Sequence, residues 1–516
     1  MRVLSRALAR VAGRSGSSPR ELVVAILVAW CLVIARSAVY IVYEHSYFDS
    51  DQAIPGLMAK HLVEGRAFPL FLYGQTYMLS VDAWVAAPFI WAAGPTVAAL
   101  RSSLVFTNLV TITLIIVSLS RWCGLRPMLG LAAAVFYAFA PPLTSAFLVE
   151  AGANAPPLLW IVLLWMIRDR PLWFGAVFAI GFLNREFTAY AIPILLLVQV
   201  WERTLWRPET IRNWLIAAAV GAAVWQGIDA LKPYSDMMGP GTRGQLIHGY
   251  GGSQFGNMAE RAEIIVSDLP KRTLAMLTVH LPRMYGARFV RDPSASQGRD
   301  WIYWPLVTGL VLALGRGAWL VVRGQRTRAV GGASSAVPSP GDRTTFAWYL
   351  IGVGLTAASA YIATRDATGT VDRYLLLTLF FPIGIGALFL TVEPLAWPRR
   401  AFIALLLLWA GCSAVDHVRL AARYWGGREP NEVRVIADAL VARGRTAAIS
   451  TYWRAYKITY IAQERVKVAA TDFVRIDEYQ RLADAEGDRL IEIRETRCPE
   501  GEHIGVWFLC RFQPAR

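Results

Sequence analysis

Long apolar runs, separated by short basic segments, are the feature that most limits how this chain can fold. A helix needs roughly 20 apolar residues to cross the hydrocarbon core of a bilayer. Hydrophobic residues make up 55% of the chain and charged residues only 17%, which excludes an ordinary soluble domain. The pattern predicts a polytopic membrane protein with spans near 22–43, 100–120, 127–142, 146–167, 214–230, 301–322, 346–363, 374–391 and 401–418.

The segment 171–200 is apolar except for Asn184, Arg185 and Glu186 near its middle. It is too long for one untilted span and too short for two full ones. We expect a hairpin of two short helices with these three residues at its tip. The expected fold is therefore mainly α, with about eleven transmembrane helices in a membrane domain of residues 1–418.

The basic residues indicate the orientation of the spans, because cytoplasmic loops are enriched in Lys and Arg. Residues 1–21 hold five arginines and one acid, so we expect a cytoplasmic N-terminus. A cleaved signal peptide ending near Ala35 and Ser37 is the alternative. If the spans alternate, the loops 44–99 and 231–300 lie outside and the other basic connections lie inside. We therefore assign the net charge of +15 to topology and to contact with anionic lipids, and not to nucleic-acid binding.

The tail, residues 419–516, combines helix-like and strand-like patterns and predicts a small α/β domain. An odd number of spans places this domain outside. Cys498 and Cys510 lie twelve residues apart beside a hairpin-like PEGEHIG turn, and an oxidising compartment would favour a disulfide between them. Two unrelated thiols are the alternative. The segment 323–343 is rich in Gly, Ser and Pro, and we expect a flexible linker there.

The stretch YFDSDQA follows the first span and carries Asp49 and Asp51. Apolar residues and His61 recur on one helical face after Asp51, which predicts an amphipathic helix along the membrane interface. Both aspartates would lie at its N-terminal end, where free N–H groups favour an anion. A hydrated loop acid, a helix cap, an ion ligand and a general base all fit this position.

Arg185 and Arg373 are expected at bilayer depth on the outer side, at the hairpin tip and at the start of DRYLLLTLFFPIG. Charges at that depth are costly unless they pair with an opposite charge or have a function such as binding a ligand. Pairing of Arg185 with Glu186 is an incomplete account, since adjacent helical residues point in different directions. Two guanidiniums there suit the phosphate of a lipid. Snorkelling to the interface is the alternative for both arginines.

Several separated segments resemble the sequences of one family. SDQAIPGLMAKHLVEGRAFPLFLYGQTYMLSVDAWVAAPF is similar to a first external loop, GFLNREFTAYAIP lies where relatives often read LTKGP, and DRYLLLTLFFP is similar to RYLLP. The tail segment ISTYWRAYKITYIAQ is similar to a recurring DYWxAYxLTF pattern. Together these segments resemble the GT-C class membrane glycosyltransferases of the protein-mannosyltransferase and aminoarabinose-transferase superfamily, the bacterial glycosyltransferase family 39-like group.

This resemblance implies an inverting transfer of a sugar from a polyprenyl-phosphate donor to a lipid, glycan or protein acceptor. It implies an enzyme of the inner (plasma) membrane that acts on the extracytoplasmic side. A single displacement needs one base on the acceptor hydroxyl and cationic groups near the departing phosphate.

The same resemblance assigns roles to individual residues. Asp51 falls on the first-loop acid and is implied as the catalytic base. Arg185 replaces a lysine of the relatives, and both it and Arg373 are implied as ligands of the donor phosphate. Tyr374, beside Arg373, is expected at the donor phosphate with the two arginines. The substrate cavity is expected to include Tyr73, Gln75, Tyr77, Glu150 and Glu186.

The departures from the family pattern concern the acids. Gln52 stands where relatives carry Glu, which removes one carboxylate, and Glu150 is a candidate for the missing acid. A helix-end charge that reaches the interface is the alternative for Glu150. Asp49 and Asp51 form a DxD that can bind a divalent cation, although two carboxylates are few ligands for a hard cation.

Two other functions remain compatible with the sequence. A transporter or flippase of lipid-linked glycans would also have many spans and buried arginines, but the chain lacks an evident duplicated half. A catalytically impaired homologue, with Gln52 marking lost chemistry and the tail binding a partner, is the third candidate.

Overall fold

The computed structural model describes residues 18–75, 77–152, 154–235, 258–286, 300–331, 340–364, 372–427 and 429–512. The first four arginines of the N-terminal segment and parts of the 231–300 and 323–343 segments lie outside these ranges.

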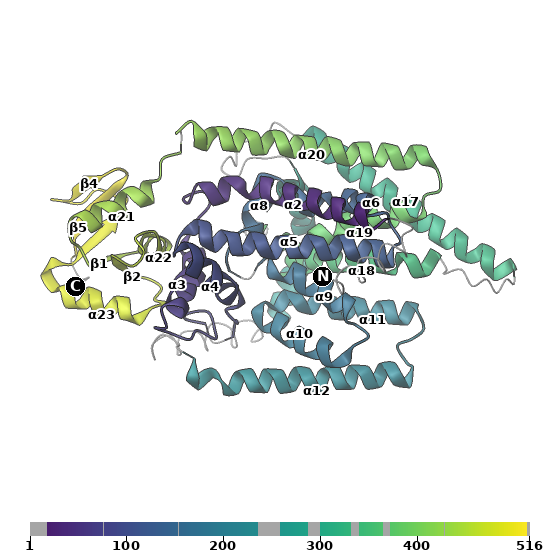
Figure 1. Cartoon of the computed structure of the whole chain (residues 1–516), viewed down its shortest axis with the longest axis horizontal. Coiled ribbons are helices and arrows are strands. Elements are labelled where there is room, and N and C mark those ends of the chain that lie inside the picture. Colours follow the sequence, from purple (N-terminus) through teal and green to yellow (C-terminus); the bar gives the residue numbers. More distant parts are fainter. Residues whose placement is uncertain are drawn as a thin grey trace.

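Seven helices of the described residues are long and apolar enough to cross a membrane (Figure 1). They confirm seven of the predicted spans and make the chain a multi-pass, mainly α membrane protein. Their elements are α2 (Pro19–Val42), α5 (Val97–Trp122), α12 (Pro208–Ala230), α17 (Asp300–Gly331), α18 (Pro340–Thr364), η6 (Asp372–Leu379) continued by α19 (Phe380–Val392), and α20 (Ala396–Trp425).

Four short helices replace the two full spans expected at 127–142 and 146–167, so that expectation was wrong. They are α6 (Pro127–Ala133), α7 (Val135–Ala138), α8 (Pro142–Leu148) and α9 (Pro156–Met166). Three of the four begin with a proline at the first turn, where its missing N–H costs nothing. The chain between α8 and α9 is a loop that carries Glu150.

The expected hairpin is present as α10 (Pro171–Asn184), η1 (Glu186–Tyr190) and α11 (Ala191–Trp201). The helix α10 ends at Asn184, and Arg185 has an extended backbone that interrupts the helical run. The start of α10 and the end of α11 line one cavity, so the chain reverses at the NRE tip as predicted.

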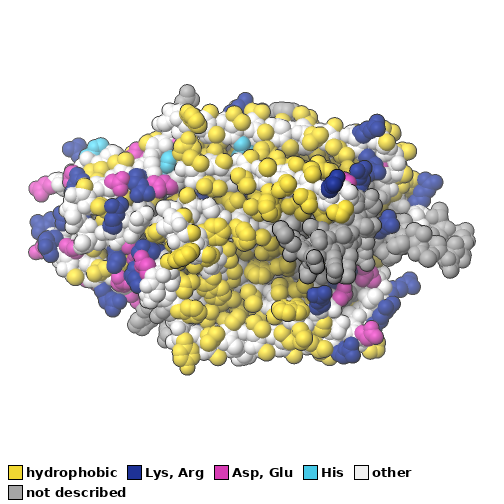
Figure 2. All heavy atoms as spheres, in the orientation of Figure 1, with side chains coloured by type: hydrophobic (Ala, Val, Ile, Leu, Met, Phe, Trp, Pro, Cys, Tyr) yellow, Lys and Arg dark blue, Asp and Glu magenta, His cyan; other side chains and the backbone are white. Residues whose placement is uncertain are grey.

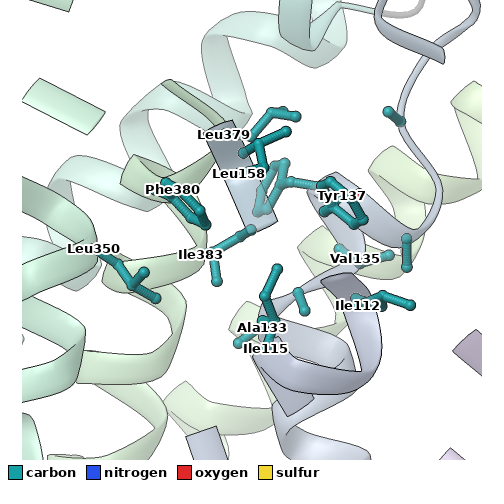
Figure 3. Packing of buried hydrophobic residues seen from close by; sticks show 14 of the residues in the cluster. Ile112, Ile115, Ala133, Val135, Tyr137, Leu158, Leu350, Leu379, Phe380 and Ile383 are labelled. Carbon is teal, nitrogen blue, oxygen red and sulfur yellow. The ribbon is translucent and has the colours of Figure 1, made fainter. Parts of the chain in front are cut away.

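The helical body has an apolar surface between two charged ends, as expected for a protein surrounded by lipid (Figure 2). Its interior is equally apolar. Side chains from several helices meet in one core, including Ile112, Ile115, Leu158, Leu350 and Ile383 (Figure 3).

The first loop, residues 44–99, contains α3 (Ser50–Val63) and α4 (Val81–Ala93). The expectation of an amphipathic α3 was wrong, because its residues are buried on every side from Gln52 to His61. The physical reason is tertiary: α22 (Tyr452–Ile461) of the C-terminal domain (residues 429–512) packs on the face that would otherwise meet solvent. A Cβ on Gly56 would lie 2.6 Å from the Tyr460 ring, so this packing requires glycine.

The C-terminal domain is a small α/β unit, as predicted. It contains a five-stranded sheet of order β2-β1-β3-β5-β4, in which β1 pairs in parallel with β2 and β3 and the remaining pairs are antiparallel. Cys498 and Cys510 form a disulfide beside the last hairpin. The elements are α21 (Glu432–Ala442), β1 (Ala447–Ser450), α22 (Tyr452–Ile461), β2 (Lys467–Ala470), α23 (Asp477–Glu486), η7 (Gly487–Arg489), β3 (Ile491–Arg494), β4 (Glu502–Ile504) and β5 (Trp507–Arg511).

A buried ionic cluster joins this domain to the first loop. The Glu464 carboxylate, with 3% of its side chain exposed, accepts from Lys60, from His61 Nε2 at 3.1 Å and from Arg66 Nη1 at 3.0 Å. The Tyr479 hydroxyl also donates to it at 2.8 Å. The domain therefore has a fixed position at one end of the helical body (Figure 1).

The remaining described elements lie between α12 and α17 in the sequence. They are η2 (Lys232–Tyr234), α15 (Met258–Ala275), the π-helical segment η4 (Met276–His280) and α16 (Leu281–Tyr285).

Candidate active site

A polar cavity of about 230 Å³ lies where the first loop, the α8–α9 loop, the NRE tip, the start of η6 and the C-terminal domain meet. Six of the residues expected at a substrate site line it: Asp51, Gln75, Glu150, Arg185, Arg373 and Tyr374. Residues far apart in the sequence thus supply acids and guanidiniums to one space.

Asp51 lies in the first turn of α3 and points its carboxylate into this cavity. Its Oδ2 accepts a hydrogen bond from Arg373 Nη2 at 3.0 Å, and its Oδ1 accepts from the Tyr452 hydroxyl at 2.6 Å. Each carboxylate oxygen keeps a further lone pair. The side chain remains 26% exposed, so an incoming hydroxyl can reach it.

Arg373 holds two carboxylates at once. Its Nη1 donates to Glu150 Oε1 at 2.7 Å while Nη2 holds Asp51. Glu150 is only 1% exposed, and burial raises the pKa of its carboxyl to about 8, although Arg373 acts in the opposite direction. The snorkelling alternative for Glu150 was therefore wrong, since the side chain turns inward.

Asp49 has a different use. It is the N-cap of α3, and its Oδ1 accepts from the Gln52 backbone N–H at 3.0 Å. Burial raises the pKa of the Asp49 carboxyl, and the nearby Asp51 carboxylate adds to the effect. Asp49 does not line the cavity that Asp51 lines.

The DxD, one candidate for a cation site, does not have the geometry of such a site. No group of three or more His, Cys, Asp or Glu side chains with metal-binding geometry occurs within the described ranges. Asp49 caps a helix and Asp51 is held by Arg373 and Tyr452, so neither offers a cation a set of several free oxygens.

Gln52, the departure from the family pattern, also turns away from the cavity. Its Nε2 donates to the Tyr47 carbonyl at 2.6 Å, and its Oε1 accepts from Arg101 Nη2 at 3.3 Å. The side chain is 1% exposed. At this position the amide links α3 to the buried Arg101, and the Gln52 side chain does not line the cavity.

Arg185, unlike Arg373, has no close carboxylate partner. Its Nη1 lies 3.3 Å from Met78 Sδ, and its ion pair with Glu186 is long at 3.8 Å. The aromatic rings of Phe187 and Tyr374 lie 5.0 and 5.2 Å from it. Glu186 itself is 44% exposed and is not among the cavity-lining residues, contrary to expectation.

Two tyrosines were assigned to the cavity wrongly. Tyr73 is 1% exposed in the core behind it, where its hydroxyl meets His61 Nδ1 at 2.9 Å. Tyr77 is half-buried and does not line the cavity.

Sequence reasoning missed two residues of the C-terminal domain, Tyr452 and Arg475. Tyr452 binds Asp51 directly, and Arg475 Nη1 donates to the Tyr73 carbonyl at 3.2 Å. With its amide oxygen toward Arg475, Gln75 also accepts from both terminal nitrogens of that guanidinium. The segment that resembles DYWxAYxLTF contains Tyr452 and was the available signal.

Five buried polar atoms of the cavity-lining residues have no hydrogen-bond partner among the described residues. They are Glu150 Oε2, Asn154 Oδ1 and the Nε atoms of Arg185, Arg373 and Arg475. Buried polar atoms are nearly always hydrogen-bonded in folded proteins. A polar ligand or water in this cavity would supply the missing partners.

Fold and site together define a multi-pass helical membrane protein whose C-terminal α/β domain completes a cavity of paired arginines and carboxylates. No protein-family model and no curated protein sequence matches the chain. Among solved structures, ArnT from Cupriavidus metallidurans bound to undecaprenyl phosphate aligns with 11% identity over 92% of each chain, at a TM-score of 0.35. The apo state of the same protein aligns with 12% identity over 86% of this chain and 88% of that one, at a TM-score of 0.34.

Proposed function

We propose that the protein is an inverting glycosyltransferase that moves a sugar from a polyprenyl-phosphate donor to an acceptor hydroxyl. The observation that carries this proposal is the cavity in which Asp51, bound by Arg373 and Tyr452, lies together with Arg185 and several unpaired polar atoms. The sequence resemblance of the first loop supports the same reaction.

Asp51 serves as the general base in this proposal. It accepts the proton of the acceptor hydroxyl, whose oxygen then bonds to the anomeric carbon on the face opposite the phosphate. The bond between that carbon and the phosphate oxygen breaks, and its electron pair stays on the phosphate. One base suffices for such a single displacement, and general bases typically contribute a factor of ~10²–10⁴ to rate.

Arg185 receives the developing phosphate charge. Its side chain is 12% exposed, and its guanidinium contacts two aromatic rings and a sulfur rather than a close carboxylate. Preorganised donors at the leaving group are an effective source of transition-state stabilisation.

Arg373 was expected to bind the same phosphate, but its two terminal nitrogens already bind Asp51 and Glu150. We therefore assign it first to positioning Asp51. Glu150 keeps Arg373 in place, and the Tyr452 hydroxyl fixes the second oxygen of the base.

The acceptor remains a lipid, glycan or protein, and the proposed location is the inner membrane with the C-terminal domain on the extracytoplasmic side. A flippase of lipid-linked glycans would use a similar set of arginines. It would not need a hydroxyl-accessible carboxylate held by two donors, and that feature favours transfer.

Proteoliposomes supplied with labelled undecaprenyl-phosphate sugars and candidate acceptors would test the proposal. A transferase releases one undecaprenyl phosphate for each sugar joined to the acceptor, with inverted anomeric configuration. Movement of intact donor across the bilayer without release of the carrier would support the flippase and contradict the transferase.

A further inference from the structure

Two cavities join at the end of α10 that lies away from Arg185. One is a polar cavity of about 250 Å³ at the starts of α10 and α12 and the end of α11. The other is an almost wholly apolar cleft of about 650 Å³ that runs along the contact of α10 with α12. Phe174, Trp214 and Ala217 line both, so the two form one continuous site with a polar head and an apolar body.

The apolar cleft has the dimensions of one bilayer leaflet. Phe174, Phe178 and Phe182 recur every fourth residue along α10, and Trp214 and Trp225 face the cleft from α12. The two tryptophans are eleven residues apart, or about 16 Å at the helical rise. One leaflet of hydrocarbon is about 15 Å thick. The cleft therefore matches an acyl chain that lies parallel to the helices.

The polar cavity combines charges of both signs. Arg168 and Arg207 line it together with the carboxylates Asp169, Glu202 and Glu209. The Arg168 guanidinium lies 4.0 Å from the Trp165 ring centre, which restricts its position. A headgroup with only negative charge would meet three carboxylates against two guanidiniums, so the composition favours a headgroup of both signs.

The starts of α10 and α12 add positive partial charge to the same cavity. Neither helix has a side-chain hydrogen bond at its N-cap, because these positions are Arg170 and Arg207. Pro171 and Pro208 supply no N–H, but the positive partial charge of each first turn still favours an anion such as phosphate. Groups of positive and negative charge are thus neighbours in one cavity.

We propose that this site binds a phospholipid whose headgroup carries a phosphate and a primary ammonium, that is, phosphatidylethanolamine. The guanidiniums and helix starts bind the phosphate, the carboxylates bind the ammonium, and the aromatic cleft holds an acyl chain. The lipid lies in the leaflet remote from the candidate active site, and its binding does not depend on the proposed transferase activity.

Native mass spectrometry of the full chain, extracted from vesicles with equal amounts of dioleoyl phosphatidylethanolamine, phosphatidylcholine and phosphatidylglycerol, tests this site. We expect phosphatidylethanolamine to be retained about tenfold over phosphatidylcholine, the ratio given by one charge-assisted hydrogen bond. The double variant Glu202→Gln, Glu209→Gln should lose this preference. Glu21→Gln, an acid that pairs with Arg126 outside the cavity, should keep it.

A second variant separates the site from general effects on folding. Ala218 is exposed and lines the apolar cleft, so Ala218→Trp fills the cleft without disturbing the core. It should reduce retention of all three phospholipids. Equal retention of the three by the unmodified protein would indicate unselective surrounding lipid and overturn the proposal. Preference for phosphatidylglycerol, or displacement of bound phospholipid by undecaprenyl phosphate at equal concentration, would overturn it as well.

Discussion

Glu464 is the residue on which the position of the C-terminal domain depends most. Its carboxylate is almost fully buried and binds Lys60, His61 and Arg66 of the first loop. Removing one partner of a buried ion pair typically costs ~3–5 kcal/mol, because the other charge stays buried. Lys60 and Arg66 each retain Glu64, at 2.8 and 3.3 Å. We therefore expect Glu464→Gln to lower the free energy of unfolding by about 2–3 kcal/mol, below that range.

Chemical unfolding in detergent, combined with hydrogen exchange of α3 and α22, measures this effect. Both helices should exchange faster in Glu464→Gln, since Tyr460 and Gly56 lose their fixed contact. The matched control is Glu478→Gln, which also removes an acid bound to Arg66 but is 33% exposed. Exposed pairs contribute about 0–1 kcal/mol. Equal losses in the two variants, or unchanged exchange in Glu464→Gln, would refute the reasoning.

The pH dependence of this cluster has a defined sign. Burial alone would raise the pKa of Glu464, but the hydrogen bonds and charges of His61, Lys60 and Tyr479 hold it well below its usual range. A carboxylate with a lowered pKa stabilises the fold above the pKa of its unfolded form, about 4.3. The stability difference between Glu464→Gln and the unmodified protein should therefore be present at pH 7 and shrink as the pH falls below about 4.

Two further predictions concern the cavity itself. Arg185→Ala should weaken binding of undecaprenyl phosphate by about tenfold or more, because one charged hydrogen bond is worth ~1.5–3 kcal/mol. Binding of undecaprenol, which lacks the phosphate, should be unchanged. Equal weakening for both lipids, measured by calorimetry, would contradict the phosphate assignment. Burial raises the pKa of Glu150 to about 8, so ionisation of this group lowers the stability of the unmodified protein as the pH rises from about 4.5 to 8. Glu150→Gln removes the titrating group and should therefore flatten the pH dependence of stability over this range. Unfolding curves from pH 5 to 9 check this, and parallel curves for the two proteins would count against it.

The long spans were predictable because hydropathy alone defines them. The region 127–166 was not, since its apolar sequence continues through four short helices and only the prolines at 127, 142 and 156 mark where three of them start. Hydropathy measures burial in lipid or protein without separating the two. The same limit explains the wrong prediction for α3. Its less apolar face was expected to meet solvent, but the C-terminal domain covers that face.

The sequence predicted those residues of the candidate site that lie in recognisable motifs. Asp51, Arg185 and Arg373 were found from charges next to apolar runs and from the family pattern, and the structure brings them to one cavity. The contacts of Arg373 with Glu150 and of Tyr452 with Asp51 join residues more than 200 positions apart. No local sequence pattern encodes such pairs, because they arise from tertiary packing.

The DxD offers the most direct test of the account, since its two aspartates differ in role but not in chemistry. Asp49→Asn keeps a good helix N-cap, because Asn and Asp cap equally well, whereas Asp51→Asn removes the proposed base. With labelled undecaprenyl-phosphate sugar and a competent acceptor, we expect turnover by Asp49→Asn within about twofold of the unmodified protein and a loss of ~10²–10⁴-fold for Asp51→Asn. Near-normal turnover by Asp51→Asn would contradict the central claim.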